Sequence, residues 1–235
     1  MLDPDERERQ VVELLAKWPT ELSGVLIGGY AVAAYGRPRY SEDIDVLASS
    51  KNQSEWVRWL EKQHLQRERI YSSPKREEHP VEVQLWHRKD VSLDLMTGGI
   101  RDRESHAVIP EAWILQNPKS IRLELLSGRV ESPVNVVRLE GLWAMKILAG
   151  RPQDVTDLFG IVTQPVKLTE VRDMFNDLDQ PALRSKFDST LKRIREPKSY
   201  VDALSRLRLG SPQLRENQSA WERFGKMVEA ITRLR

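Results

Sequence analysis

The sequence has no cysteine among its 235 residues, which excludes disulfide bonds and thiolate metal sites. Its four histidines are scattered without the spacing of metal ligands, so we assign them no role. No apolar run approaches the roughly 18 residues that a membrane helix needs. Met1 is followed by the charged stretch LDPDERERQ, which lacks the apolar core of a signal peptide. We therefore expect a cytoplasmic protein with no membrane partner.

The P-loop pattern G-x-x-x-x-G-K-[ST] is also missing, which argues against an ordinary NTPase. The apolar content of 40% and the charged content of 31% are typical of a globular protein. The small net charge of +2 is unevenly spread, because residues 181–235 hold 13 lysines and arginines against 6 acids. Such a basic end could recruit a polyanion such as RNA, although solvated helix faces would explain the same charges.

The pattern of the chain changes near residue 139. Before it, short apolar or alternating strands occur between helices; the strands are GVLIGG, SEDIDVLAS, VEVQLWH, VSLDLMTGG and VNVVRL. After it, helical segments follow one another with short breaks. We predict an α+β core over residues 1–139 and a helical C-terminal domain over residues 140–235.

Two carboxylates stand in the predicted strand SEDIDVLAS. Side chains alternate along a strand, so Asp43 and Asp45 project to one face while Ile44 and Val46 project to the core. The two acids are then roughly 6.6 Å apart along the backbone. Their charges repel each other, and a shared Mg²⁺ ion would remove that repulsion. The alternative is a solvated pair at the end of a strand, without a function.

The surroundings of this pair favour a function. Gly28 and Gly29 precede a short helix that begins near Tyr30, and such a turn lets backbone N–H groups approach phosphates. A further acid, Asp94, alternates with apolar residues in VSLDLMTGG. If this strand pairs with residues 42–48, three acids meet beside a phosphate-binding turn, as in two-metal phosphoryl transfer.

This order of glycine pair, short helix, D-x-D strand and later lone acid resembles the polymerase-beta-type nucleotidyltransferase superfamily. A second block, LWAMKILAGRPQDVTDL, resembles the lysine–arginine–aspartate–aspartate segment of its AbiEii-like branch, with Lys146, Arg151, Asp154 and Asp157 in those positions. Many proteins of that branch are toxins of toxin–antitoxin and phage-defence systems. The resemblance covers about residues 22–162, and the last 70 or so residues match nothing that we recognise.

The resemblance implies a mixed, twisted sheet flanked by helices. It also implies transfer of a nucleoside monophosphate from an NTP to a hydroxyl, with Mg²⁺ or Mn²⁺ as cofactor and RNA favoured as acceptor. Asp43 and Asp45 would hold both metal ions, and Asp94 would bind the catalytic ion and orient or deprotonate the hydroxyl. Glu82 is the next candidate if Asp94 is wrong. A protein antitoxin would be a possible partner.

The same resemblance suggests a nucleotide-binding set, which is Gly28, Gly29, Tyr30, Arg39, Ser41 and Lys146. Many members of the superfamily have serine or threonine after the first glycine or the pair, whereas this chain has Gly29 and then Tyr30. Ser41, two residues before the D-x-D pair, could partly replace the missing hydroxyl. Arg37 and Arg39 flank that strand and could contact phosphates.

The second block allows several interpretations. Lys146 lies in an apolar helix, where it would either contact the nucleotide or extend its amine to water. Asp154 and Asp157 share a helix face, so they could orient Lys146 or Arg151, join the site, or reflect the preference for acids at a helix start.

Two other functions stay open at this point. A catalytically inactive nucleotidyltransferase fold could serve as a binding partner, and the unusual Tyr30 supports that alternative. A D-x-D glycosyltransferase would also use a metal ion, but it would not explain the glycine pair or Asp94.

Overall fold

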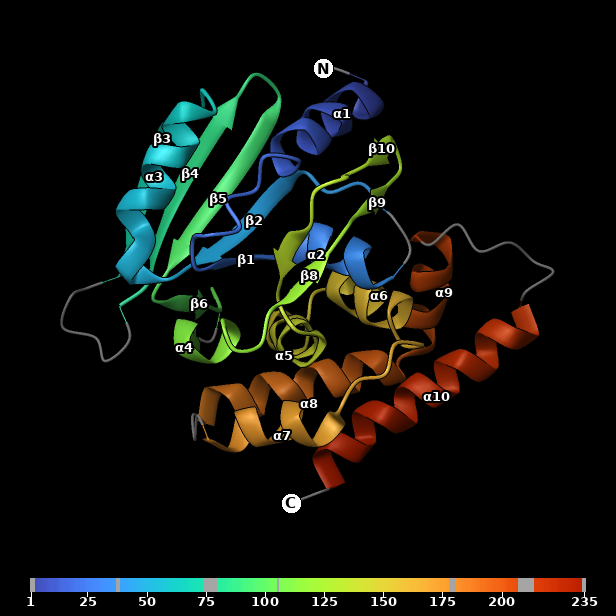
Figure 1. Ribbon diagram of the computed structural model, residues 1–235. Helices are drawn as coiled ribbons and strands as arrows, with labels where there is room; N and C mark the ends of the chain where they lie inside the picture. The colour runs from blue at the N-terminus through green and yellow to red at the C-terminus, as the bar shows by residue number, and fades with distance from the viewer. Residues whose placement is uncertain are drawn as a thin grey trace. The chain divides into compact units, whose positions relative to one another are not determined.

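The computed structural model describes residues 3–36, 39–73, 80–104, 106–177, 181–206 and 214–233. The chain divides into two compact units (Figure 1). The first comprises Met1–Arg101 and Val108–Arg138, and the second comprises Asp102–Ala107 and Leu139–Arg235. Each unit is treated by itself below.

The described part of the first unit contains a seven-stranded sheet in the order β3-β4-β5-β2-β1-β11-β8. In that order the strands are Gln66–Ser72, Glu82–Arg88, Val91–Thr97, Asp43–Ala48, Gly24–Ile27, Val134–Val136 and Lys119–Ile121. β2 pairs with β5 and β1 with β11 in parallel, and the other neighbours are antiparallel. The predicted α+β class with a mixed sheet flanked by helices is confirmed.

Short elements complete this unit. The helices are α1 (Pro4–Leu15), α2 (Gly28–Tyr35), the 3₁₀ turn η1 (Ser50–Asn52), α3 (Gln53–Lys62) and α4 (Glu111–Ile114). Two ribbons pair β6 (Gly99–Arg101) with β7 (Val108–Pro110) and β9 (Glu124–Leu125) with β10 (Gly128–Arg129). The sequence did not indicate β3, α4 or the strands between residues 99 and 129.

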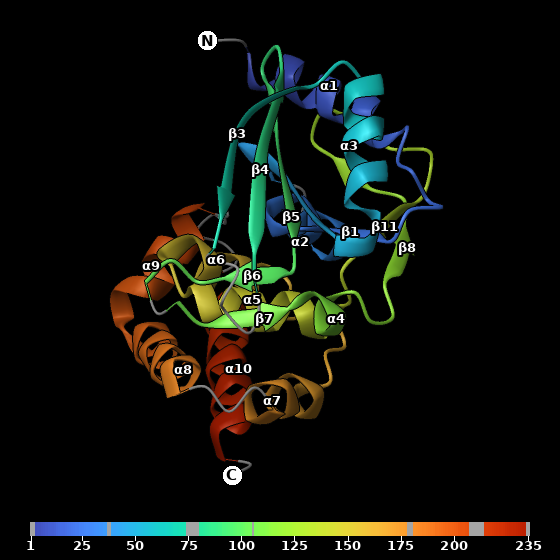
Figure 2. The same ribbon diagram turned by 90° about the vertical axis from the view of Figure 1, so that its left-hand side faces the viewer.

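Helix α3 covers one face of the sheet, as Figure 2 shows. At its start Gln53 donates a hydrogen bond to Glu82, and past its end the carbonyl of Gln63 accepts from Arg88 at 3.0 Å. Glu82 and Arg88 lie six residues apart on β4, so they share a face. The buried ring of Trp56 completes this packing, and its edge contact with Trp18 spans 5.2 Å between centroids.

The alternating pattern of β5 distinguishes the two faces. Val91, Leu93 and Leu95 are buried on the α3 side, whereas Ser92 and Asp94 are half-buried on the other side. Burying branched apolar side chains at every second position fixes the register, because a slip of one residue would expose them all. The face opposite α3 is therefore where polar side chains can act.

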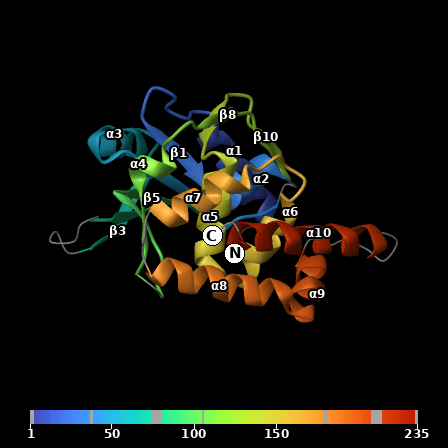
Figure 3. The ribbon, with the colours of Figure 1, turned by 90° about the horizontal axis from the view of Figure 1, so that it is seen from below.

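The second unit is helical in its described part. Its helices are α5 (Leu139–Ala149), α6 (Pro152–Gly160), α7 (Leu168–Asp177), α8 (Pro181–Arg195), α9 (Pro197–Arg206) and α10 (Leu214–Arg233). α10 lies beside α7 and α8 (Figure 3). Its Phe224 packs against Trp143 of α5 at 6.0 Å between ring centroids. No helix of the described residues is both long and apolar enough to cross a membrane.

Candidate active site

Three carboxylates lie on one face of two neighbouring strands. The parallel pairing of β2 with β5 sets Asp45 beside Asp94 and Asp43 beside Ser92. Residues paired across strands project to the same face. The Ser92 hydroxyl accordingly donates a hydrogen bond to Oδ1 of Asp43 at 2.8 Å. Asp43, Asp45 and Asp94 are all half-buried, on the face opposite α3.

The first glycine of the pair lies directly against one of these acids. Strand β1 ends at Ile27, which pairs with Asp45. Gly28 follows with φ of +64°, a left-handed conformation that strongly favours glycine. A Cβ atom at this position would lie 1.8 Å from Oδ2 of Asp45. Glycine is therefore required here both for its conformation and for the space that Asp45 occupies.

The second glycine receives two polar side chains from the segment before β2. A Cβ atom on Gly29 would lie 2.2 Å from Oγ of Ser41 and 2.9 Å from a terminal guanidinium nitrogen of Arg39. The structure thus brings Gly28, Gly29, Ser41, Arg39 and Asp45 together. Arg37, the other arginine expected near phosphates, lies outside the described residues.

Tyr30 differs from what its place beside the glycines suggests. Its side chain is 1% exposed, and its hydroxyl donates a hydrogen bond to the carbonyl of Ser41 at 3.3 Å. Burial, followed by the negative charge of Glu8, raises the pKa of Tyr30 to about 12. The phenol is therefore neutral at ordinary pH and supports the segment that carries Ser41.

Helix α1 supplies two residues that sequence reasoning did not single out. Arg7 donates to the carbonyl of Ser41 at 2.8 Å, and the fully buried Glu8 accepts from the N–H of Ser127. Both fix the surroundings of Ser41 and Tyr30. In the sequence they belong to a charged amphipathic stretch, so nothing distinguishes them from solvated residues.

Glu82, the alternative third acid, lies on the opposite face of the sheet. Its carboxylate accepts hydrogen bonds from Gln53, Ser72 and Gln84, all on the side that α3 covers. Since Asp43 and Asp45 project to the other face, Glu82 does not join them. The structure therefore places Asp94, and not Glu82, beside the D-x-D pair.

The chemistry of the donors suits a hard cation. Carboxylate oxygens are the ligands that Mg²⁺ and Mn²⁺ favour, and three of them share one half-buried face. The missing Cβ of Gly28 leaves the space that Oδ2 of Asp45 occupies. As the side chains stand, no group of three acids or histidines within the described ranges is arranged to hold a metal ion. The residues fit the cation by chemistry and backbone placement.

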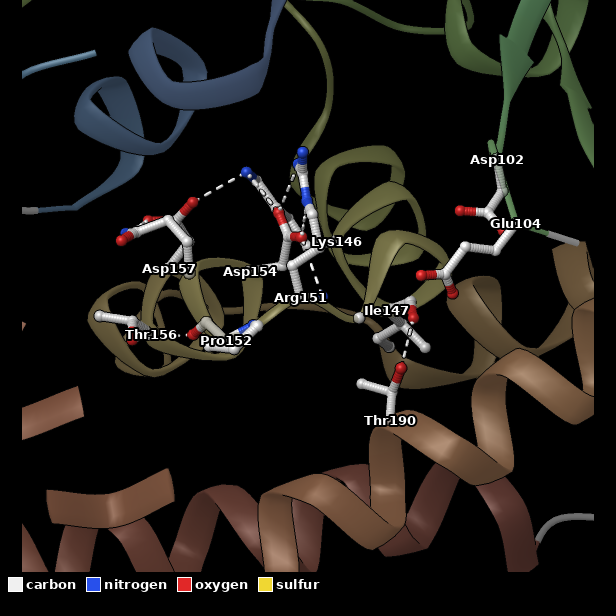
Figure 4. A network of polar contacts seen from close by, with 12 residues as sticks. Asp102, Glu104, Lys146, Ile147, Arg151, Pro152, Asp154, Thr156, Asp157 and Thr190 are labelled. Carbon is white, nitrogen blue, oxygen red and sulfur yellow. Dashed lines mark hydrogen bonds and ion pairs between the residues drawn. The ribbon is translucent and has the colours of Figure 1, made fainter. Parts of the chain in front are cut away.

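The second sequence block forms a buried ion cluster in the second unit (Figure 4). The Lys146 side chain is 7% exposed, and its Nζ lies 3.0 Å from Oδ1 of Asp154 and 2.8 Å from Oδ2 of Asp157. Nε of Arg151 lies 2.7 Å from the other oxygen of Asp154. The cluster connects the end of α5 to the start of α6. Lys146 therefore does not extend its amine to water.

The protonation state of this cluster follows from its contacts. Burial by itself would raise the pKa of Asp154, because it penalises the charged form. The positive charges of Lys146 and Arg151, together with their hydrogen bonds, outweigh burial and hold that pKa below its ordinary value. Asp154 is therefore ionised at neutral pH and compensates the charge of Lys146.

Comparison with known proteins decides the family. The sequence model described as "Nucleotidyl transferase AbiEii toxin, Type IV TA system" matches residues 14–233. The chain belongs to the AbiEii nucleotidyltransferase toxin family. This confirms the resemblance seen in the sequence and extends it, because the match includes the C-terminal helices that the sequence motifs left unassigned.

Solved structures similar to this AbiEii protein are more distant. JHP933 from Helicobacter pylori is 16% identical, with a TM-score of 0.42 over 97% of this chain and 89% of that one. The antibiotic-resistance factor ANT(2'')-Ia is 17% identical, with a TM-score of 0.38 over 82% of this chain and 94% of that one. No curated protein matches the chain by sequence.

Membership of the AbiEii family fixes the class of activity. The protein is a nucleotidyltransferase, which implies an NTP substrate, and its family belongs to toxin–antitoxin systems. Membership of this family favours nucleotidyl transfer over both the glycosyltransferase and the inactive binding partner. Tyr30, which supported the non-enzymatic alternative, is a buried packing residue next to Ser41.

Proposed function

We propose that this AbiEii protein transfers a nucleoside monophosphate from an NTP to a hydroxyl of RNA, as the toxin of a toxin–antitoxin pair. The observation that carries the proposal is the pairing of Asp45 with Asp94, with Gly28 packed against Asp45. Residues 1–139 would form the nucleotidyltransferase core and residues 140–235 a helical domain. The protein partner would be an antitoxin.

Asp43, Asp45 and Asp94 would hold Mg²⁺ or Mn²⁺. When bound, the cations would neutralise charge on the triphosphate and stabilise the attacking and leaving oxygens. The role of the protein is to keep three like charges on one face, where their mutual repulsion makes them cation ligands. The hydrogen bond from Ser92 orients Asp43 for this purpose.

The triphosphate would bind at the corner formed by the two glycines. The N–H groups at the start of α2, the Ser41 hydroxyl and the Arg39 guanidinium all suit phosphate oxygens. Oγ of Ser41 occupies the space of a side chain at position 29. This position supports the expectation that Ser41 partly replaces the hydroxyl that related proteins have after the first glycine or the pair.

The reaction forms a phosphodiester bond and breaks a phosphoanhydride bond. The acceptor oxygen attacks the α-phosphorus, the bond from that phosphorus to the β-bridging oxygen breaks, and pyrophosphate leaves. Asp94 orients the acceptor hydroxyl and accepts its proton. Rate enhancement comes mainly from positioning and electrostatic stabilisation, as in other phosphoryl transfers.

Lys146, Arg151, Asp154 and Asp157 would have a structural role. The amine of Lys146 already makes two short contacts with buried carboxylates. We assign it the role of fixing α5 against α6, in place of the nucleotide contact that the sequence suggested. RNA is favoured as acceptor because residues 181–235 are strongly basic.

The test is incubation with each labelled NTP, Mg²⁺ and total RNA. We expect label in RNA with the wild type and none with Asp43→Ala/Asp45→Ala. Asp90→Ala, which removes an exposed acid from the turn between β4 and β5, is the matched control and should retain activity. Equal labelling by the wild type and the double variant would refute the proposed site, and label in protein would refute RNA as acceptor.

A second comparison separates the two candidate third acids. Asp94→Asn should abolish transfer, while Glu82→Gln should leave the turnover of the folded enzyme largely unchanged. The opposite ranking would assign the third ligand to Glu82.

A further inference from the structure

The face that carries the three acids continues across β4 to the edge strand β3. Cross-strand pairing defines two adjacent rows on this face. From β2 to β3, the first row is Asp45, Asp94, Leu85 and Arg69, and the second is Leu47, Met96, Val83 and Tyr71. Leu47 is fully buried, whereas the members of both rows on β5, β4 and β3 are half-buried or exposed, so a surface leads from Asp94 to the rim of the sheet.

The far end of this surface carries a preassembled polar and aromatic pair. The Arg69 guanidinium carbon lies 5.7 Å from the centroid of the Tyr71 ring, and Nη1 of Arg69 donates to the Tyr71 hydroxyl at 2.8 Å. Tyr71 is 49% exposed, so its ring is open to contact with a ligand. Val83, Leu85 and Met96, between this pair and the acids, are only half-buried.

In-line chemistry determines from which side the acceptor enters. The attacking and leaving oxygens stand on opposite sides of the phosphorus. Pyrophosphate would leave toward Gly28 and Gly29, which lie on the β1 side of the acids. The attacking hydroxyl must then come from the other side, where β5, β4 and β3 follow in order. Asp94, assigned to that hydroxyl, is on β5.

We propose that Arg69, Tyr71, Val83, Leu85 and Met96 form an acceptor platform for the end of single-stranded RNA. This inference rests on the proposed function. The apolar floor and the Tyr71 ring suit the faces of unpaired bases, and Arg69 suits a phosphate or a stacked base. A double helix cannot offer its base faces to such a surface, which is why the platform selects unpaired ends.

The dimensions fix which nucleotides make the contact. Two strand spacings separate Asp94 from Arg69, which is about 10 Å. Stacked nucleotides rise by about 3.4 Å each. The platform therefore spans roughly two or three nucleotides, so Tyr71 and Arg69 contact the second or third nucleotide upstream of the accepting hydroxyl.

The test compares Tyr71→Ala with Ile70→Ala. Ile70 lies on the same strand with a similar exposure of 44%, but it pairs with Gln84 and faces the other way. We expect Tyr71→Ala to weaken binding of labelled single-stranded RNA, measured by fluorescence anisotropy, about tenfold, since stacking on an aromatic ring contributes that much per base. Tyr71→Phe and Ile70→Ala should stay within about twofold of the wild type.

Transfer kinetics add a readout that a general loss of structure would not give. Tyr71→Ala should raise KM for an eight-nucleotide acceptor and leave KM for the NTP unchanged. A mononucleoside acceptor is too short to reach Tyr71. Transfer to it should therefore have the same KM with the wild type and with the variant. Equal melting temperatures of the Tyr71→Ala and Ile70→Ala proteins would exclude misfolding as the cause.

Three results would overturn the acceptor platform. Tyr71→Ala could behave like Ile70→Ala, it could raise KM for the NTP alone, or it could impair only a protein acceptor. If the wild type labels RNA but is insensitive to Tyr71→Ala, the platform fails while the proposed function stands. If RNA binds through Tyr71 without ever being labelled, the proposed function fails and the platform remains as an RNA-binding surface.

Discussion

Replacing Lys146 by methionine tests the ion cluster of the second unit. Methionine keeps an unbranched apolar stem but removes the ammonium that donates hydrogen bonds to Asp154 and Asp157. Both carboxylates are essentially fully buried, at 0% and 1% side-chain exposure. Removing one partner of a buried ion pair leaves an uncompensated charge, which usually costs about 3–5 kcal/mol.

That cost should be visible as a fall in melting temperature. In a unit of this size, 1 kcal/mol corresponds to about 4–8 °C, so Lys146→Met should lower the transition of the second unit by at least about 12 °C. Arg151→Met is the matched control, because the Arg151 side chain is 71% exposed. Only one partner of the Arg151–Asp154 pair is buried, so its loss should cost less than the loss of Lys146.

The pH dependence gives the sign of the effect. In the wild type the lowered pKa of Asp154 contributes stability at neutral pH that is lost as pH falls through that pKa. In Lys146→Met, burial is opposed only by Arg151, so Asp154 takes up a proton more readily and the variant loses less on acidification. The difference in unfolding free energy, measured by denaturant titration at pH 7 and pH 4.5, should therefore shrink at the lower pH.

Two outcomes would refute this reasoning. Unfolding of Lys146→Met within about 1 kcal/mol of the wild type at pH 7 would mean that the cluster contributes little stability. A stable variant with a raised KM for the NTP would show that Lys146 contacts the nucleotide instead.

Two further predictions concern the first unit. Gly28→Ala should abolish transfer and destabilise the fold by about 1–3 kcal/mol, because its Cβ would meet Oδ2 of Asp45 and its φ is +64°. The control is Gly225→Ala, where a Cβ meets nothing within 4 Å. This variant should be tolerated in the same activity and melting assays. Tyr30→Phe should lessen alkaline destabilisation between pH 10 and 12, because the folded-state pKa of about 12 makes the wild type lose about 3 kcal/mol as pH rises through that window. Denaturant titrations showing the same alkaline loss in Tyr30→Phe would contradict the second prediction.

The local part of the site could be predicted from the sequence. Alternation placed Asp43 and Asp45 on one face, and the glycine pair marked a turn where other residues do not fit. The pairing of β2 with β5 could only be stated as a condition, because it joins segments about 50 residues apart and no local pattern encodes such a partner. The contact between Asp45 and Gly28 likewise depends on how the strands pair.

Other features could not be read from the sequence for physical reasons. Helix α2 is apolar on nearly all sides, which is typical of a buried helix, but this pattern does not reveal that the Tyr30 hydroxyl bonds the carbonyl of Ser41. Strand β3 is exposed along its whole length and has no alternating apolar residues, so it carries no strand signal although its backbone pairs with β4. The motif around Lys146 left several roles open, and the distances to Asp154 and Asp157 favour the structural one.

The most direct test of the three-acid site is a crystal structure with Mn²⁺ and a non-hydrolysable NTP, read by anomalous scattering. We expect manganese peaks within coordination distance of Asp43, Asp45 and Asp94, with the triphosphate against Gly28 and Gly29. Manganese bound elsewhere, with these three carboxylates making no contact to it, would contradict the site on which the proposed transfer depends.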